Sequence, residues 1–386
     1  MICVVEKALL RVSAAGFALI LCAGQASAHV KWFSTFDVAA SPQSLDYLQL
    51  PDFKLLLVLS LLILLLGCLL EESPLGPRVM NAFDRVTVWL RTDTDRLVRT
   101  VCAFFFIALW TMGGIILTPE LKTSVPGVPW LQLAMAIALI WRATAPLAAL
   151  GIVALFALGV WQYGIFHLAD YPIFLGIAAY LTLTGLQRNF FGIRPLDIMR
   201  WATGITLMWA SIEKWAYPQW SFPLIAQHPS LTLGFESNFF MLAAGAIEFT
   251  LAFALLWTPL VRRFAAVVLA GMFIGACFEF GKLDVIGHTG IVVVLLVIIG
   301  DDMRTEVSRK DLLLAPAGYA VALAVFLGAY YGMHAALFTA SNTDAAAVVQ
   351  PAVAKPMERA PRFSFASRLI QREPPTSSSD GFRTAR

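Results

Sequence analysis

The sequence predicts an all-α polytopic membrane protein with about ten transmembrane helices. Three observations predict this class: 59% of the 386 residues are hydrophobic, only 14% are charged, and the mean hydropathy is +0.75. A chain this apolar is typical of membrane proteins rather than of soluble globular domains. The net charge of +3 at pH 7 is too small to indicate a protein that binds nucleic acid. We therefore expect contact with membrane lipid and no nucleic-acid partner.

The N-terminus, residues 1–28, has the three-part pattern of a cleaved signal peptide. A basic start, an apolar run from Val12 to Cys22 and the small-residue pattern "ASA" ending at Ala28 follow one another. An uncleaved anchor helix is the alternative. Cleavage after Ala28 would leave residues 29–52 as an exported N-terminal segment.

Ten apolar windows have approximately the length that a helix needs to cross the hydrocarbon core of a bilayer. They are 53–70, 101–118, 130–142, 145–161, 171–186, 198–216, 238–257, 264–281, 287–300 and 313–337. The third and the ninth windows are short, so we expect them to tilt or to re-enter the membrane. The predicted count is therefore ten helices, give or take one or two.

The distribution of basic residues predicts the orientation. The segment 71–98 after the first window contains four arginines and is followed directly by Arg99, and the loops after the fifth, seventh and ninth windows are also basic. The positive-inside rule places these segments in the cytoplasm. We therefore expect a bacterial inner (plasma) membrane protein whose mature N-terminus is periplasmic. The tail 340–386 is rich in Ala, Pro, Ser and Arg and is expected to be disordered.

The chain contains an internal repeat. "WQYGIFHLADYPIFLGIA" from Trp161 aligns with "FEFGKLDVIGHTGIVVVL" from Phe278, and "RTVCAFFFIALW" from Arg99 aligns with "RWATGITLMWAS" from Arg200. The alignment predicts two tandem four-helix units between two flanking helices. The flanking helices and the two units are 53–70, 99–186, 198–300 and 313–337. Because each unit has an even number of helices, the two copies would share one orientation.

Ionisable side chains collect in the periplasmic half of the second unit. They are Glu213, Lys214, Glu248, Glu279, Lys282 and His288. The first unit is nearly free of such residues. Ionisable residues inside a membrane are costly, so each one indicates a functional site by default. The alternative is that they form internal ion pairs that fix helix register, such as Glu213 with Lys282 or Glu279 with Lys214.

The carboxylates are the predicted catalytic groups. A carboxylate in a low-dielectric pocket can accept and donate protons, which redox chemistry on a quinone requires. Glu248 is the first candidate because it lies near the middle of its helix without a charged neighbour in sequence, and Glu279 and Glu213 follow. The predicted cofactor-binding residues are Arg200, Lys214, Lys282 and His288.

The five histidines all fall on the periplasmic side of the predicted topology. They are His29, His167, His228, His288 and His334. Imidazole is a common ligand of copper, zinc and iron. If the signal peptide is removed after Ala28, the free amino group and the imidazole of His29 together can chelate Cu(II), with a further histidine completing the plane. No HxH or HExxH spacing is present, so a metal site would be assembled from separate segments, and each histidine can equally be an ordinary hydrogen-bonding residue.

The second unit contains the segments "RWATGITLMWASIEKW" from Arg200, "AAGAIEFTLAFALLWTPLVRR" from Ala243 and "AAVVLAGMFIGACFEFG" from Ala265. These segments resemble the first three helices of the DoxX/DoxD-like family of bacterial integral membrane proteins. The match is confined mainly to 198–300. It implies a four-helix bundle associated with terminal quinol oxidase and thiosulfate:quinone oxidoreductase systems. The recurrent polar positions of the family correspond to Arg200, Glu213, Lys214 and Glu248.

The sequence departs from this family through its duplication, its exported segment and its extra helices. With the resemblance, the polar residues predict a quinone-linked redox component or the membrane subunit of an oxidoreductase system, with a quinone as cofactor and partner proteins of a redox system as electron carriers. One alternative is a non-catalytic assembly or scaffold subunit. Another is a transporter or metal-handling protein that uses the periplasmic-side histidines.

Overall fold

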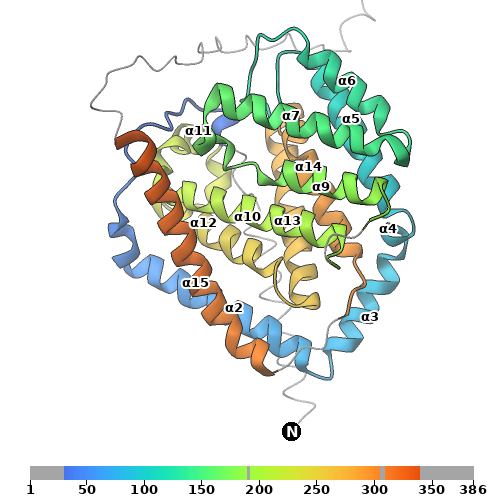
Figure 1. Cartoon of the computed structure of the whole chain (residues 1–386). Helices are drawn as coiled ribbons and strands as arrows, with labels where there is room; N and C mark the ends of the chain where they lie inside the picture. Colours follow the sequence, from blue (N-terminus) through green and yellow to red (C-terminus); the bar gives the residue numbers. More distant parts are fainter. Residues whose placement is uncertain (1–29, 189–191, 305–308, 340–386) are drawn as a thin grey trace, which may run out of the picture. The chain divides into compact units, whose positions relative to one another are not determined.

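The computed structural model describes residues 30–188, 192–304 and 309–339, and these residues are predominantly helical (Figure 1). The helices are α2 (Pro51–Glu72), α3 (Gly76–Val86), α4 (Val88–Thr92), α5 (Thr94–Met112), α6 (Val128–Ala138), α7 (Ala145–Tyr163), α8 (Ile165–Leu168), α9 (Pro172–Gly185), α10 (Pro195–Ala216), α11 (Phe222–Gln227), α12 (Ser237–Ala254), α13 (Pro259–Phe280), α14 (Lys282–Gly300) and α15 (Arg309–His334). The predicted all-α class is confirmed. The predictions for residues 1–28, His29 and 340–386 lie outside the described residues.

Six described helices are long and apolar enough to cross a membrane. They span Pro51–Glu72, Arg142–Tyr163, Ser237–Ala254, Pro259–Phe280, Lys282–Gly300 and Leu314–Phe338. Two further apolar helices, α6 and α9, are shorter. Each of the ten predicted windows overlaps with one α-helix, namely α2, α5, α6, α7, α9, α10, α12, α13, α14 and α15. The chain is therefore a multi-pass membrane protein, and the count of ten spans stays a prediction.

Two of the helix boundaries that differ from the predicted windows have clear local reasons. Helix α14 begins at Lys282 rather than at residue 287 and has 19 residues, so this helix is longer than its predicted window. The polar residues Lys282 and Asp284 hid its first turn from the hydropathy pattern, although Asp284 is buried and hydrogen-bonded to the buried His288 one turn further along. Helix α5 ends at Met112, because Gly113 and Gly114 have φ angles of +68° and +63°, in the left-handed region that favours glycine.

The flanking helices α2 and α15 pack against each other and leave most of their surface uncovered (Figure 1). Large apolar side chains such as Leu55, Leu62 and Val321 are about half exposed or more. Helix α13, by contrast, is mostly buried inside the protein. An uncovered apolar helix face of this length fits contact with lipid acyl chains.

Arginines near the starts of four helices donate hydrogen bonds to the ends of neighbouring helices. Each donates from its guanidinium group to a carbonyl at or just beyond the last turn of another helix, which also places a cation at the negative end of that helix dipole. The pairs are Arg99 with Leu139 and Ile140, Arg142 with Thr184, Arg200 with Leu255, and Arg263 with Ile299, at N···O distances of 2.8 to 2.9 Å. We call this side of the bundle the arginine end. The helix starts and ends that meet here are those that the predicted alternating topology places on one side of the membrane, and that topology stays a prediction.

The two aligned motifs share a backbone turn. Gly164 follows α7 with a φ angle of +83°, and Gly281 follows α13 with a φ angle of +76°. In both places one helix ends directly before the glycine and the next begins directly after it. This common geometry supports the alignment of the motifs, while the arrangement as two tandem four-helix units stays a prediction.

Helices α9 and α10 approach each other closely at Gly176. A Cβ atom at this position would lie 2.4 Å from the Cβ of Ala202 and 3.2 Å from the Cα of Met199. Small residues at such contacts let membrane helices pack backbone to backbone. Because α9 belongs to the first predicted unit and α10 to the second, this contact joins the two.

Candidate functional site

A buried lysine from the N-terminal segment lies between two carboxylates of the helical bundle. Lys31 is on a short 3₁₀ helix (Val30–Trp32), Asp170 precedes α9, and Glu213 lies in the last turn of α10. The Nζ atom of Lys31 forms ion pairs with both carboxylates. Only 2% of the Lys31 and Asp170 side chains and 10% of Glu213 are exposed. The three charges are therefore almost completely removed from solvent.

A third buried carboxylate extends this group. Glu120, in the segment between α5 and α6, accepts a hydrogen bond from the hydroxyl of Tyr171, and its Oε1 atom lies 3.2 Å from Nε2 of His167. We call the six residues the Lys31 cluster: Lys31, Glu120, His167, Asp170, Tyr171 and Glu213. With its carboxylates ionised and its histidine neutral, the cluster contains three negative charges and one positive charge.

Burial and charge act in opposite directions on Lys31. Burial alone would lower the pKa of its ammonium group. The negative charges of Asp170, Glu213 and Glu120 outweigh burial and raise the pKa of Lys31 well above its ordinary value. Lys31 is therefore a permanent cation, and any proton that the cluster exchanges is held by the other groups.

Aromatic rings complete the surroundings of the ammonium group. The Nζ atom of Lys31 lies 5.7 Å from the ring centre of Phe36 and 5.6 Å from that of Trp220. Trp220 is in turn stacked on Tyr217, with ring centres 4.0 Å apart. Cation–π contacts of this kind stabilise a desolvated ammonium group.

Three hydrogen bonds fasten the rest of the N-terminal segment to the bundle. The hydroxyl of Tyr217 donates to the carbonyl of Ala40 at 2.8 Å, and the amide of Gln43 donates to the carbonyl of Ala216 at 2.7 Å. The hydroxyl of Tyr331 on α15 donates to the carbonyl of Gln43 at 2.8 Å. The segment therefore covers the side of the bundle opposite the arginine end, which we call the Lys31 end.

Glu248, the first catalytic candidate, is paired with Lys214. The Nζ and Oε2 atoms are 2.5 Å apart, and the side chains are 14% and 8% exposed. Lys214 directly follows Glu213 in α10. The Lys214–Glu248 pair is therefore adjacent in sequence to the Lys31 cluster. The observed pairs differ from the Glu213–Lys282 and Glu279–Lys214 pairs considered from the sequence, and Lys282 is exposed.

The remaining candidates do not join this site. Glu279 contacts His228, with 2.7 Å between Oε1 and Nδ1, and both side chains are 30% exposed. Arg200 is at the arginine end, where it binds Asp197 and the carbonyl of Leu255. The structure thus brings Glu213 into the Lys31 cluster, pairs Lys214 with Glu248, and places Glu279 and Arg200 elsewhere.

The four described histidines do not form one metal site. His167 contacts Glu120, His228 contacts Glu279, and His288 contacts Asp284 with 2.9 Å between Nδ1 and Oδ2. His334 packs against the rings of Phe166 and Phe338 instead. His29, the predicted copper ligand, lies outside the described residues.

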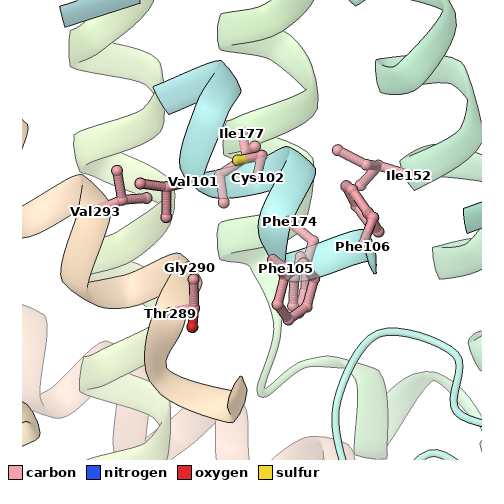
Figure 2. A pocket seen from close by; sticks show the side chains of 10 residues that line it. All are labelled: Val101, Cys102, Phe105, Phe106, Ile152, Phe174, Ile177, Thr289, Gly290 and Val293. Atoms are coloured by element: carbon pink, nitrogen blue, oxygen red, sulfur yellow. The ribbon is translucent and has the colours of Figure 1, made fainter. Parts of the chain in front are cut away.

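A small apolar cavity lies between α5, α7, α9 and α14 (Figure 2). Its lining includes Cys102 and Phe105 from α5, Phe174 from α9 and Gly290 from α14. The rings of Phe105 and Phe174 are stacked, with centres 6.0 Å apart. The cavity has a volume of about 10 Å³, which is close to the space that one water molecule requires. It is much smaller than a pocket for an organic ligand, which has on the order of 300 Å³ or more.

Sequence reasoning missed Lys31, Asp170 and Glu120. All three lie outside or at the ends of the apolar windows, where a charged residue is normally solvated. One signal was available for Asp170, because it lies in the repeated motif "WQYGIFHLADYP". Its aligned partner motif contains Asp284 and His288, which form the buried pair on α14.

Comparisons with protein-family models, with curated proteins and with solved structures give no match for this chain.

Proposed function

We propose that the protein is a proton-handling membrane component of a quinone-linked redox system, located in the bacterial inner membrane with its Lys31 end in the periplasm. The observation that carries this proposal is the burial of three carboxylates around the single ammonium group of Lys31. The resemblance of 198–300 to the DoxX/DoxD-like family supports the link to quinones.

The charge balance of the Lys31 cluster supports proton exchange. Three ionised carboxylates in a low-dielectric environment repel one another, and one ammonium group compensates only part of their charge. Such a group of sites lowers its energy by sharing protons, which it gains and loses as a coupled set. Tyr171 and His167 provide further hydrogen-bonding groups through which a proton can pass.

A quinone takes up two electrons and two protons when it is reduced to the quinol. In this proposal the electrons come from a partner protein, and the Lys31 cluster supplies or receives the protons. The cavity of Figure 2 is too small for a quinone head group. The quinone would therefore bind at the lipid-facing surface beside the cluster, or after the N-terminal segment moves away from the bundle.

The test is the quinone content of the full chain purified in detergent, extracted and quantified against protein. We expect near-stoichiometric quinone in the wild type and a loss in Glu213→Gln, Asp170→Asn and Glu248→Gln. Glu279→Gln is the matched control, because Glu279 is partly exposed and contacts His228 outside the cluster. The absence of quinone from the wild type, together with no quinol-dependent redox activity in native membranes, would reject the proposal.

A second candidate is a non-catalytic assembly subunit, and the close pairing of the buried charges favours it. Lys214 and Glu248 satisfy each other, and Lys31 satisfies two carboxylates. In this alternative the pairs only fix the positions of the helices. The variants would then change thermal stability without changing quinone content, and a defined partner protein would co-purify with the chain.

A further inference from the structure

Three metal-ligating side chains from two helices converge near the junction of α13 and α14. Cys277 is in the last turn of α13, and Asp284 and His288 lie one helical turn apart near the start of α14. One ligand atom from each residue lies within 4.8 Å of the other two. Among the described residues this is the one group in which three potential metal ligands meet so closely. It is separate from the Lys31 cluster and uses none of its residues.

Asp284 has an unused oxygen in this group. Its side chain is completely buried, and its Oδ2 atom contacts Nδ1 of His288 at 2.9 Å. Its Oδ1 atom is also buried but has no hydrogen-bond partner. A buried carboxylate oxygen without a partner costs free energy. A cation bound beside Oδ1 would remove this cost.

The donor set favours a particular class of ion. A thiolate, an imidazole and a carboxylate together match Zn²⁺ and related divalent transition metals, whereas Mg²⁺ and Ca²⁺ prefer oxygen ligands alone. With metal–ligand distances of about 2.0 to 2.3 Å, the ligand atoms of one tetrahedral ion lie about 3.3 to 3.8 Å apart. The observed spacing of up to 4.8 Å requires only a small movement of the side chains.

We propose that Cys277, Asp284 and His288 form a binding site for a divalent transition-metal ion, with Zn²⁺ as the representative. The thiol of Cys277 loses its proton when the ion binds, and His288 presents Nδ1 without a proton. The ion then replaces the present hydrogen bond between Nδ1 and Oδ2. Three protein ligands leave the fourth position of a tetrahedral zinc ion for an exchangeable ligand.

The N-terminal segment covers this site. The ring of Trp32 contacts His288 with ring centres 4.8 Å apart, and Phe273 contacts the same imidazole at 4.7 Å. Trp32 also lies over Gly287, where a Cβ atom would be only 2.0 Å from its Cη2 atom. Gly287 therefore allows the close approach of Trp32, and Trp32 controls access of an ion to the site. We expect Trp32→Ala to load with metal several-fold faster than the wild type.

The experiment measures zinc in the full chain purified in detergent. The protein is stripped with a chelator, incubated with Zn²⁺, freed of excess metal and assayed for zinc and protein. We expect about one zinc per chain in the wild type, and a loss of roughly tenfold or more in affinity for Cys277→Ala and Asp284→Asn. Cys102→Ala and His228→Asn are matched controls from outside the site and should keep their zinc.

Two readouts on the wild type do not depend on how the variants fold. Co²⁺ in place of Zn²⁺ should give the charge-transfer absorption of a cobalt–thiolate bond. Zn²⁺ should also slow alkylation of Cys277 in a peptide-resolved measurement. The proposal is overturned if the wild type retains no zinc, if Cys277→Ala retains as much as the wild type, or if metal is lost only in His29→Ala. That last result would instead support copper or zinc binding at the exported N-terminus.

Discussion

The ammonium group of Lys31 bridges the carboxylates of Asp170 and Glu213, although Asp170 follows Lys31 by 139 positions in the chain. The ion pairs connect the N-terminal segment to the start of α9 and to the end of the adjacent helix α10. They also determine the charge balance of a site that is otherwise buried and acidic.

Removal of this ammonium group should destabilise the protein strongly. Lys31→Met leaves several buried carboxylates without a cation, and breaking a buried ion pair from one side costs about 3–5 kcal/mol. We expect a large decrease in the thermal unfolding temperature of the detergent-solubilised protein. Lys122→Met is the matched control, because Lys122 is exposed. Addition of Asp170→Asn to Lys31→Met should restore part of the loss, and no recovery would mean that the two residues are not coupled.

Loss of Glu248 should have a smaller effect. Glu248→Gln keeps a polar group beside Lys214 but removes its charge, and Lys214 is 14% exposed, so its ammonium group can turn towards water. We expect a cost of about 1–3 kcal/mol in the free energy of unfolding. Glu279→Gln, at a position that is 30% exposed, should cost less than about 0.5 kcal/mol. Equal effects of the two variants would contradict this ranking.

A methyl group at Gly245 should disturb the packing of α12 against α10. A Cβ atom there would lie 2.3 Å from Nε1 of Trp215, which donates to the carbonyl of Leu242 at 3.1 Å. Gly245→Ala should therefore cost about 1–3 kcal/mol. Gly271→Ala is the matched control in α13, where a Cβ atom meets nothing within 4 Å. It should stabilise the protein by up to about 1 kcal/mol through helix propensity.

Acid should weaken the arginine end through Asp84. Partial burial alone would raise the pKa of Asp84, but hydrogen bonds from Arg263 and Arg304 outweigh burial and lower it. Because the folded-state pKa is below the unfolded value, the contribution of Asp84 to stability is complete above about pH 5, roughly one unit above the unfolded pKa. It is lost as the pH falls through the lowered pKa. Unfolding temperatures measured from pH 7 to pH 3 should therefore fall further for the wild type than for Asp84→Asn, and parallel curves would show that Asp84 contributes no pH dependence.

The helices were predictable because membrane burial imposes long apolar segments that can be read locally. All ten windows overlap with helices. Arg99 and Arg263 from the basic segments bind carbonyl groups at helix ends that the predicted topology places on the same side. The predicted start of α14 was wrong because Asp284, which precedes the predicted window, is paired with His288 within the same helix. Hydropathy counts such residues as polar, whereas the folded helix buries them as a pair.

The candidate site was predictable only in part, because it depends on pairs between distant segments. Glu213 and Glu248 were found through their cost inside a helix. Lys214, the partner of Glu248, was also a candidate, but their pairing was not predicted. The residues around Glu213 were missed, since Lys31 lies in a segment without helical periodicity and Asp170 lies in a short connection between α8 and α9. A local pattern contains no information about which of several lysines reaches a given carboxylate.

The hydrogen bonds that hold the N-terminal segment against the bundle affect the order of events in biosynthesis. Residues 30–49 leave the ribosome before any of the helices that hold them, and their contacts with Ala216, Tyr217 and Tyr331 become possible only when almost the whole chain has been made. Contacts between such distant positions form late and slowly. Until then, newly inserted helices carry Asp170 and Glu213 without their cation. The docking of this segment would therefore be a final maturation step, at which a quality-control protease distinguishes finished molecules from unfinished ones.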